Sequence, residues 1–189
     1  EEANLILGTD LLEHPEKAEG ANNIVIVGGG VVGCETAHWL ANEYGKNVTV
    51  LEMLPHFMMG VCTANRGHLL HYLEKSGVRL YNCTKVKALA KDGVYVEQNQ
   101  SQTVPDPYNT WQPLLPPNIP NPMEKAIKEE IVEKKIPADL IVLAMGGKAD
   151  ETFFFEAGEE HLAKEIYNIG DSSRAGRVLE AVRGAYHLA

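Results

Sequence analysis

The sequence predicts an α/β fold: a parallel β-sheet with helices on both faces and an antiparallel β excursion. Two observations lead to this prediction. Apolar runs of strand length alternate with stretches of helical periodicity between residues 23 and 82, which is typical of parallel strands joined by right-handed helical crossovers. The dipeptide Asp92-Gly93 then separates two stretches of alternating polarity, and this pattern predicts an antiparallel hairpin.

The first elements follow one another closely. Residues 1–21 are acidic with weak helical character, and we expect a lead-in or linker there. Residues 23–27 are a short β-branched run that ends at glycine, which indicates a buried strand. Residues 31–44 have apolar residues at helical spacing and stop before Gly45, as a helix commonly does. Residues 47–52 form the second predicted strand.

The same alternation continues once more. Residues 63–77 predict a helix with Thr63 as its N-cap and Gly77 at its end. A third strand follows at 78–82. Because strands in this order need crossover connections, the three strands are expected to run parallel.

The second half of the chain is less regular. Residues 104–122 hold seven prolines, so they are predicted as an excursion without regular helix or central strand. Residues 123–139 can be read as helix or strand, and the alternation within residues 129–136 favours a strand of the antiparallel excursion there. We further expect strands at 140–147 and 165–171 and a helix at 177–188.

Composition excludes several classes of function. The net charge of −9 comes without a basic cluster, which argues against binding nucleic acid or an anionic membrane surface. The apolar runs are too short to cross a bilayer. Three cysteines without C-x-x-C spacing predict free thiols and no metal site, and their scarcity is typical of the reducing cytoplasm.

A glycine-rich loop stands between the first strand and the first long helix. Gly28, Gly30 and Gly33 match G-x-G-x-x-G. In this motif the first glycine permits a tight turn, the second lets the backbone approach a pyrophosphate, and the third lets the helix press on the strand. The amides at the helix start then face the phosphates. The loop therefore predicts a Rossmann-like dinucleotide-binding fold.

Glu52 indicates which dinucleotide is bound. It ends the second strand, where a carboxylate accepts hydrogen bonds from the adenosine ribose hydroxyls. A 2′-phosphate would be repelled by this carboxylate, and residues 53–59 contain no Lys or Arg to attract one. The sequence therefore predicts NAD(H) in preference to NADP(H).

Several stretches resemble a known family. The stretch "GGGVVGCETA" is similar to the NAD-binding domain of the pyridine nucleotide–disulfide oxidoreductase superfamily, in which a Glu follows the last loop glycine by two positions, as Glu35 does here. "LIVLAMGG" resembles the strand that returns to the flavin domain, and "IYNIGD" resembles a motif whose Asp, here Asp171, bonds the ribityl chain of FAD. More narrowly, "VCTANRGHLLHYLEKSGV" and "YNIGDSSRAGRVLEAVRGAYHLA" are similar to NADH:flavin oxidoreductases of the 2-enoate reductase and 2,4-dienoyl-CoA reductase type.

The resemblance implies a larger parent enzyme. Such enzymes pass hydride from NADH to FAD, and electrons then reach FMN through an iron–sulfur cluster to reduce an activated C=C bond. The flavin-bearing barrel, the cluster cysteines and the first FAD glycine loop are not in this sequence. We therefore expect an NADH-binding fragment that is inactive by itself, whose partners are NADH and the missing portions of the parent chain, with homo-oligomerisation left open.

The predicted organisation follows from these assignments. Residues 1–21 are the lead-in, residues 22–147 the NAD-binding Rossmann-like domain with the proline-rich insertion at 104–122, and residues 148–189 a remnant of the FAD-binding domain. No catalytic residue is predicted. The predicted cofactor-binding residues are Gly28, Gly29, Gly30, Val31, Val32, Gly33, Glu35, Glu52, Met53, Val86, Gly146, Gly147 and Asp171.

Alternatives stay open for some of these residues and for the function. Glu35 would lie near the nicotinamide, or it would only interact favourably with the helix dipole in the first turn. Val86 would contact adenine or pack in the core, and Gly146 and Gly147 would lie beside the cofactor or form a turn. The alternatives to a reductase are a nucleotide-sensing module and a methyltransferase, although the glycine spacing and the later "AMGG" and "IGD" stretches disfavour the methyltransferase.

Overall fold

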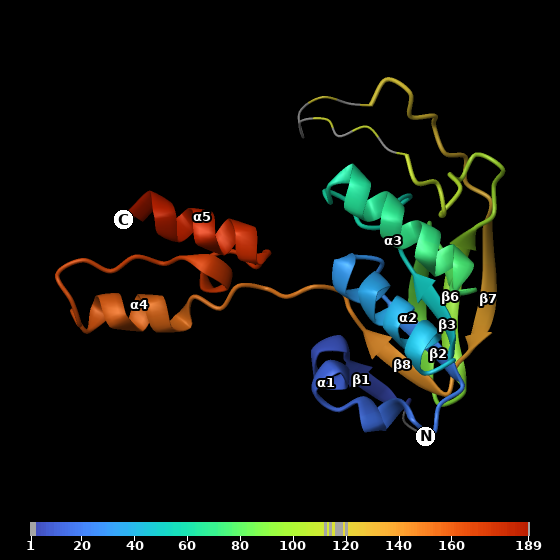
Figure 1. Ribbon diagram of the computed structural model, residues 1–189, viewed down its shortest axis with the longest axis horizontal. Helices are drawn as coiled ribbons and strands as arrows, with labels where there is room; N and C mark the ends of the chain where they lie inside the picture. The colour runs from blue at the N-terminus through green and yellow to red at the C-terminus, as the bar shows by residue number, and fades with distance from the viewer. Residues whose placement is uncertain (1–2, 112, 114, 116–118, 120, 189) are drawn as a thin grey trace. The chain divides into compact units, whose positions relative to one another are not determined.

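The computed structural model describes residues 3–111, 113, 115, 119 and 121–188. The chain divides into two compact units, Glu1–Met145 and Gly146–Ala189, which Figure 1 shows in blue to orange and in orange to red. Each unit is described by itself below. None of the described helices has the length and apolar character needed to span a membrane.

A five-stranded parallel sheet is the centre of the first unit. Its order is β1-β8-β2-β3-β4, and every neighbouring pair is parallel. In the central strand, Val25 is aligned with Thr49 on one side and Ile141 on the other. The strands are β1 (Leu5–Leu7), β2 (Asn23–Val27), β3 (Asn47–Leu51), β4 (Arg79–Tyr81) and β8 (Leu140–Leu143).

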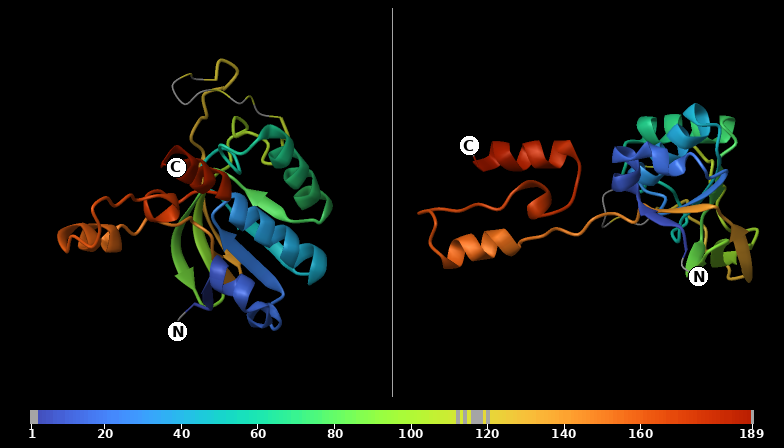
Figure 2. Two further views of the ribbon diagram at one scale, coloured as in Figure 1. Left: turned by 60° about the vertical axis from the view of Figure 1, so that its left-hand side comes forward. Right: turned by 90° about the horizontal axis from the view of Figure 1, so that it is seen from below.

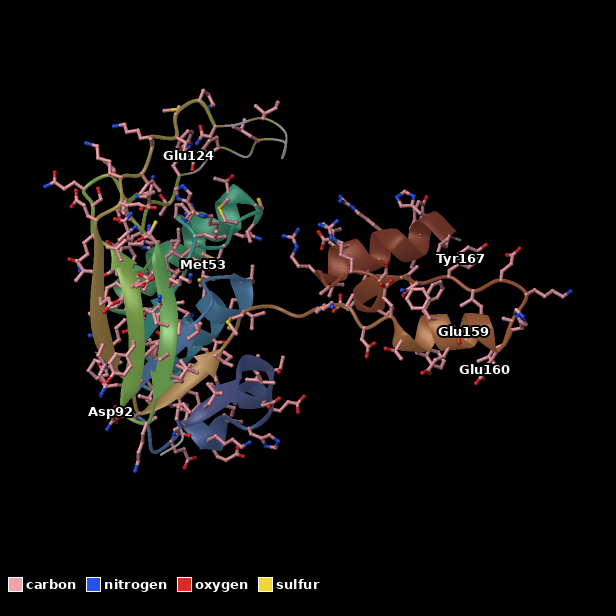
Figure 3. The ribbon with its side chains drawn as sticks, turned by 180° about the vertical axis from the view of Figure 1, so that it is seen from behind. Met53, Asp92, Glu124, Glu159, Glu160 and Tyr167 are labelled. Carbon is pink, nitrogen blue, oxygen red and sulfur yellow. The ribbon has the colours of Figure 1, made fainter. Side chains whose placement is uncertain are left out.

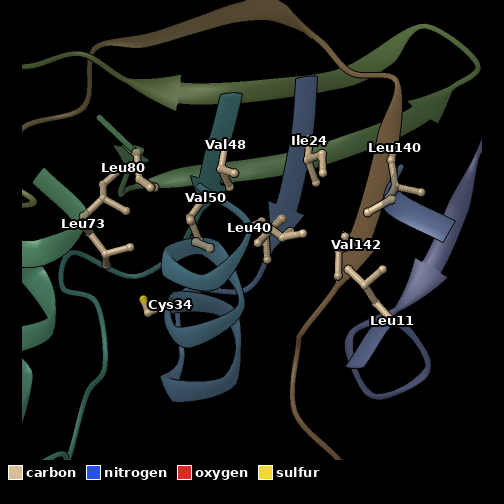
Figure 4. Close-up of a cluster of buried hydrophobic side chains, with 14 of the residues drawn as sticks. Leu11, Ile24, Cys34, Leu40, Val48, Val50, Leu73, Leu80, Leu140 and Val142 are labelled. Carbon is tan, nitrogen blue, oxygen red and sulfur yellow. The ribbon is translucent and has the colours of Figure 1, made fainter. Parts of the chain in front are cut away.

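Helices cover one face of this sheet. They are α1 (Gly8–Glu13), α2 (Val31–Glu43) and α3 (Thr63–Lys75), with a short 3₁₀ turn at Pro15–Ala18. Apolar side chains of alternate strand residues point into this layer and meet the buried faces of the helices. Figure 4 shows this cluster, including Leu11, Ile24, Leu40, Val48, Val50, Leu73, Leu140 and Val142.

A three-stranded antiparallel sheet covers the opposite face. It consists of β5 (Thr84–Ala90), β6 (Gly93–Asn99) and β7 (Ile131–Pro137), in that order, and Figure 3 shows Asp92 at the turn between β5 and β6. A second core cluster joins the two sheets: Val94, Val96 and Ile136 pack with Val25, Val27, Leu51 and Ile141. The three layers can be followed in Figure 2.

The predicted α/β fold with an antiparallel excursion is confirmed. The antiparallel sheet, however, occupies the face where the sequence predicted a second layer of helices. The physical reason is the alternation in β6, where Val94 and Val96 are buried and Tyr95 between them is exposed. That alternation gives the excursion an apolar face of its own, which covers the parallel sheet without further helices.

The segment predicted as a lead-in contributes to the sheet. Leu5 is aligned with Ile141 in the β1–β8 pair, and Ile6 and Leu11 are buried in the first core cluster. The partner strand of β1 lies more than 130 residues away in sequence. Local patterning therefore shows the weak helical character of this region but not the edge strand.

The proline-rich stretch has no regular structure in its described part, as predicted. Tyr108 packs against the first core cluster. Its hydroxyl donates to the Val78 carbonyl at 2.6 Å and accepts from the Leu80 amide at 3.2 Å. These two backbone groups flank Arg79 in the edge strand β4, so Tyr108 covers part of an open sheet edge. Residues 112, 114, 116–118 and 120 lie outside the described part.

The second unit contains α4 (Thr152–Glu159), a 3₁₀ turn at Gly170–Ser172 and α5 (Val178–Leu188). The helix predicted at 177–188 is confirmed, whereas α4 was not predicted. The strand predicted at 165–171 is wrong, because no described strand of this unit pairs with it. Ala157 is the one buried side chain among residues 146–188.

Candidate functional site

The candidate site lies where β2 ends and α2 begins, at the loop Gly28–Gly30. Gly28 has φ +113°, a backbone angle that favours glycine. A Cβ atom at Gly28 would strike the carbonyl group of Ala144, and one at Gly33 would strike the carbonyl oxygen of Gly28. The protein's own packing therefore requires glycine at both of these positions.

Gly30 differs from its neighbours. It is exposed, and a Cβ atom there would find nothing within 4 Å. Its φ of −72° and ψ of −173° are open to any residue. Nothing within the chain therefore demands glycine at this position, and the space outside the loop is open to a ligand that approaches the backbone closely.

The N-terminus of α2 points into the same region. Gly30 is the N-cap, and no side chain caps the helix. The first amides of a helix have no partner within it, and they bear the positive end of its dipole. Val31 is half-buried and Val32 is exposed beside them. This helix start can therefore bind an anion through its backbone.

Glu52 follows β3 directly, and because β2 and β3 are parallel neighbours it emerges at the same sheet edge as the glycine loop. One carboxylate oxygen accepts a hydrogen bond from the Gly29 amide at 2.8 Å, and the other accepts from the Leu54 amide at 2.8 Å. Each oxygen keeps further acceptor capacity. A half-buried carboxylate that can still accept from hydroxyl groups is therefore held against the loop.

The connection from β3 to α3 packs against the inner side of the glycine loop. Phe57 is 0% exposed, and a Cβ atom at Gly29 would come within 2.7 Å of its ring and within 2.8 Å of the Glu52 Cβ. The Met58 amide donates to the Gly29 carbonyl at 2.8 Å. Gly29 is thus needed for packing against this connection, a role that the loop motif alone could not indicate.

Cys34 lies behind the loop and is a buried free thiol. Its Sγ is 3.6 Å from the Gly29 carbonyl oxygen, to which it donates. Burial, and secondarily the charge of Glu52, raises the pKa of this thiol to about 12. The thiol therefore stays protonated at neutral pH and acts as a small packing residue.

Three further predicted residues belong to the first unit. Met53 follows Glu52 and is 67% exposed; its side chain is labelled in Figure 3. Glu35 is exposed but lies one residue beyond the first turn of α2, which contains no acidic side chain, so a dipole interaction in the first turn does not explain it. Val86 pairs with Val96 and packs against the second core cluster, which is the packing alternative.

The remaining predicted residues belong to the second unit. Gly146 has φ +86°, as expected at a turn, and Gly147 is exposed beside it. The Asp171 carboxylate accepts from the Gly176 amide at 3.1 Å within the same unit. Their part in cofactor binding stays a prediction. Within the described residues, no three His, Cys, Asp or Glu side chains are placed to hold a metal ion.

The arrangement fits a dinucleotide on two independent counts. The uncapped helix start with open space at Gly30 suits a diphosphate, and the oriented carboxylate of Glu52 suits an adjoining sugar. Phe57 and Met58 were missed by sequence reasoning. Their only signal was an apolar run directly after the acidic strand end, and that run has no distinctive spacing.

The chain is similar to several known proteins. The chain is 26% identical over 180 residues to an NADH oxidase of Thermoanaerobacter brockii, covering 95% of this chain and 23% of that protein. It is 22% identical over 177 residues to a cinnamate reductase of Clostridium sporogenes, covering 92% of this chain and 22% of that protein. The chain thus spans less than a quarter of the length of these relatives.

A solved structure and a family model complete the comparison. The fold matches 2-naphthoyl-CoA reductase in complex with 2-naphthoyl-CoA with a TM-score of 0.70 and 24% identity, covering 96% of this chain and 22% of that one. The model for pyridine nucleotide-disulphide oxidoreductases matches residues 6–171, which is most of the sequence. The chain therefore belongs to the pyridine nucleotide-disulphide oxidoreductase family.

Proposed function

We propose that the first unit binds NADH at the β2–α2 loop. The observation that carries the proposal is the Glu52 carboxylate, which two backbone amides hold beside an uncapped helix start. In this proposal the amides of Val31, Val32 and Gly33 face the diphosphate, and Gly30 admits it close to the backbone. The ribose hydroxyls donate to Glu52. When bound, the nicotinamide supplies a hydride.

The environment of Glu52 favours NADH over NADPH. A 2′-phosphate would face a carboxylate and no Lys or Arg within residues 53–59. Burial lowers the pKa of His56, and the neighbouring charge of Arg66 lowers it further. The His56 imidazole is therefore mostly neutral at pH 7 and offers little positive charge. Arg66 itself is buried and bonded to backbone carbonyls, which withdraws it from a ligand.

For the whole protein we propose a flavin-dependent reductase of an activated C=C bond, of the 2-enoate reductase type. Two findings support this proposal: the family to which the chain belongs, and the fact that the chain spans less than a quarter of the length of each relative, an NADH oxidase and a cinnamate reductase. In it, Asp171 and the second unit belong to an FAD-binding domain, and FMN and an iron–sulfur cluster belong to other parts of a longer polypeptide. Helix α5 exposes apolar residues, among them Val178, Val182 and Tyr186. In this proposal they pack against other parts of the FAD-binding domain.

Calorimetric titration tests the binding proposal. We expect NADH to bind, NADPH to bind at least about tenfold more weakly because of the Glu52 charge, and S-adenosylmethionine to give no heat. In Glu52→Arg the preference should shift toward NADPH. An unchanged preference in this variant would remove Glu52 from ribose recognition. The gene sequence upstream of Glu1 tests the larger proposal, since a sensing module would lack the barrel and the cluster cysteines.

A further inference from the structure

Arg66 is a buried cation on α3 whose guanidinium donates to backbone carbonyls of two segments outside its own helix. Its side chain is 3% exposed on α3. Its Nε donates to the Phe57 carbonyl at 2.9 Å, and its Nη1 donates to the Asn109 carbonyl at 3.0 Å. Among the described residues no carboxylate forms an ion pair with it. Burying an arginine without an ion-pair partner is costly, and its hydrogen bonds offset part of that cost. We therefore look for a role in the two segments that these hydrogen bonds hold.

The Phe57 carbonyl belongs to the segment that touches the glycine loop. The Phe57 ring fills the space beside Gly29, where a Cβ atom would collide with it. The next residue, Met58, donates its amide to the Gly29 carbonyl at 2.8 Å. Through its amide, Gly29 in turn donates to Glu52. One guanidinium is therefore linked through a single short segment to both parts of the candidate site.

We propose that Arg66 is a positioning residue for dinucleotide recognition: it holds the segment at Phe57 and Met58 so that Gly29 and the Glu52 carboxylate keep their mutual arrangement. The inference rests on the proposed NADH site. It assigns the affinity for NADH partly to a side chain that does not touch the ligand. The second bond, to Asn109, secures the same guanidinium to the proline-rich stretch.

The test compares three variants of the full chain by calorimetry with NADH. Arg66→Met keeps the aliphatic stem and removes the donors, and we expect its dissociation constant to rise about tenfold, as for the loss of a charged hydrogen bond. Arg66→Lys keeps the charge and a single donor nitrogen, so its loss should be smaller. Arg79→Met removes an exposed arginine on β4 and should leave the constant unchanged.

Hydrogen exchange separates positioning from general stability. In Arg66→Met the amides of Gly29, Leu54 and Met58 should exchange faster, while those of β2 and β3 stay protected. Adding Glu52→Gln to Arg66→Met should weaken binding by less than the product of the two single effects, because both act through one arrangement. Strictly multiplicative effects would contradict the proposal.

The outcomes distinguish this inference from the proposed function. If the unaltered protein does not bind NADH, the proposed function fails. If it binds and Arg66→Met binds equally well, the positioning role is overturned and the site stands. Should Arg66→Met not fold, Arg66→Lys decides: weaker binding with β2 and β3 still protected supports the proposal, and unchanged binding overturns it.

Discussion

At the scale of single residues, the glycines of the loop have different roles: some are required by packing within the chain, and one is not. Gly28 and Gly33 are held to glycine by contacts with the chain itself, and Gly29 by the Phe57 ring. Gly30 alone among these four has open space beside it. The motif spacing predicted the loop and its helix correctly, but all four glycines look alike in a sequence. Only the packing separates those that serve the fold from the one available to a ligand.

This difference predicts opposite effects for two substitutions. Gly30→Val should abolish NADH binding and change the free energy of unfolding by about 1 kcal/mol or less, since the site is exposed and an N-cap contributes about that much. Gly33→Val should destabilise the fold by several times more, because its side chain would meet the Gly28 carbonyl. Calorimetric titration and urea unfolding followed by circular dichroism measure the two. Retained binding in Gly30→Val would show that the loop is wrongly assigned.

Asp139 gives a residue-scale prediction about pH. Its carboxylate accepts from the Asn23 amide at 2.7 Å and the Asn22 amide at 3.0 Å, and these bonds lower its pKa. A lowered pKa in the folded state means that the stabilisation is present above the unfolded value, about 3.9, and is lost as pH falls through the folded value. Because the group is exposed, the effect should stay below about 1 kcal/mol.

The corresponding measurement is urea unfolding between pH 7 and pH 2. Asp139→Asn should be less stable than the unaltered protein at pH 7, and the two should converge below about pH 4. A difference that stays constant across this range would show that the carboxylate charge has no part in tying β2 to the turn before β8.

At the scale of elements, local sequence patterns predicted those helices and strands that depend on residues near in sequence. The run of β2, α2 and β3 was predicted because each element carries its own period, and glycines follow β2 and α2 at Gly28 and Gly45. The strand β1 was not predicted, since Leu5–Leu7 pairs with residues 141–143 of β8 from the far end of the unit. The strand expected at 165–171 failed for the complementary reason: its apolar residues had the right character, but no partner strand accompanies them among the described residues.

The edge of β4 provides a prediction at this scale. Tyr108→Phe keeps the ring and removes the hydroxyl, which donates to the Val78 carbonyl and accepts from the Leu80 amide. We expect a loss of about 1 kcal/mol in the free energy of unfolding. The matched control is Tyr44→Phe, an exposed tyrosine at the end of α2, which should change it by less than about 0.5 kcal/mol. Equal effects would mean that Tyr108 does not protect the edge through its hydroxyl.

At the scale of the whole molecule, the two units differ in how they bury apolar surface. The first unit has two apolar clusters on the two faces of one sheet. The second unit buries a single side chain among its described residues. Sequence patterns predicted the helix at 177–188 but not that its apolar residues, among them Val178, Val182 and Tyr186, would be exposed. A pattern shows that a face is apolar, whereas what covers it depends on other parts of a protein.

The most direct test of the account is an NMR titration of the ¹⁵N-labelled protein with NADH. We predict that the largest amide shifts occur at Gly30, Val31, Val32 and Leu54, since these groups surround the proposed diphosphate and ribose positions. Gly30→Val should remove these shifts. Saturable binding that leaves these four amides unmoved and shifts another region would contradict the central claim.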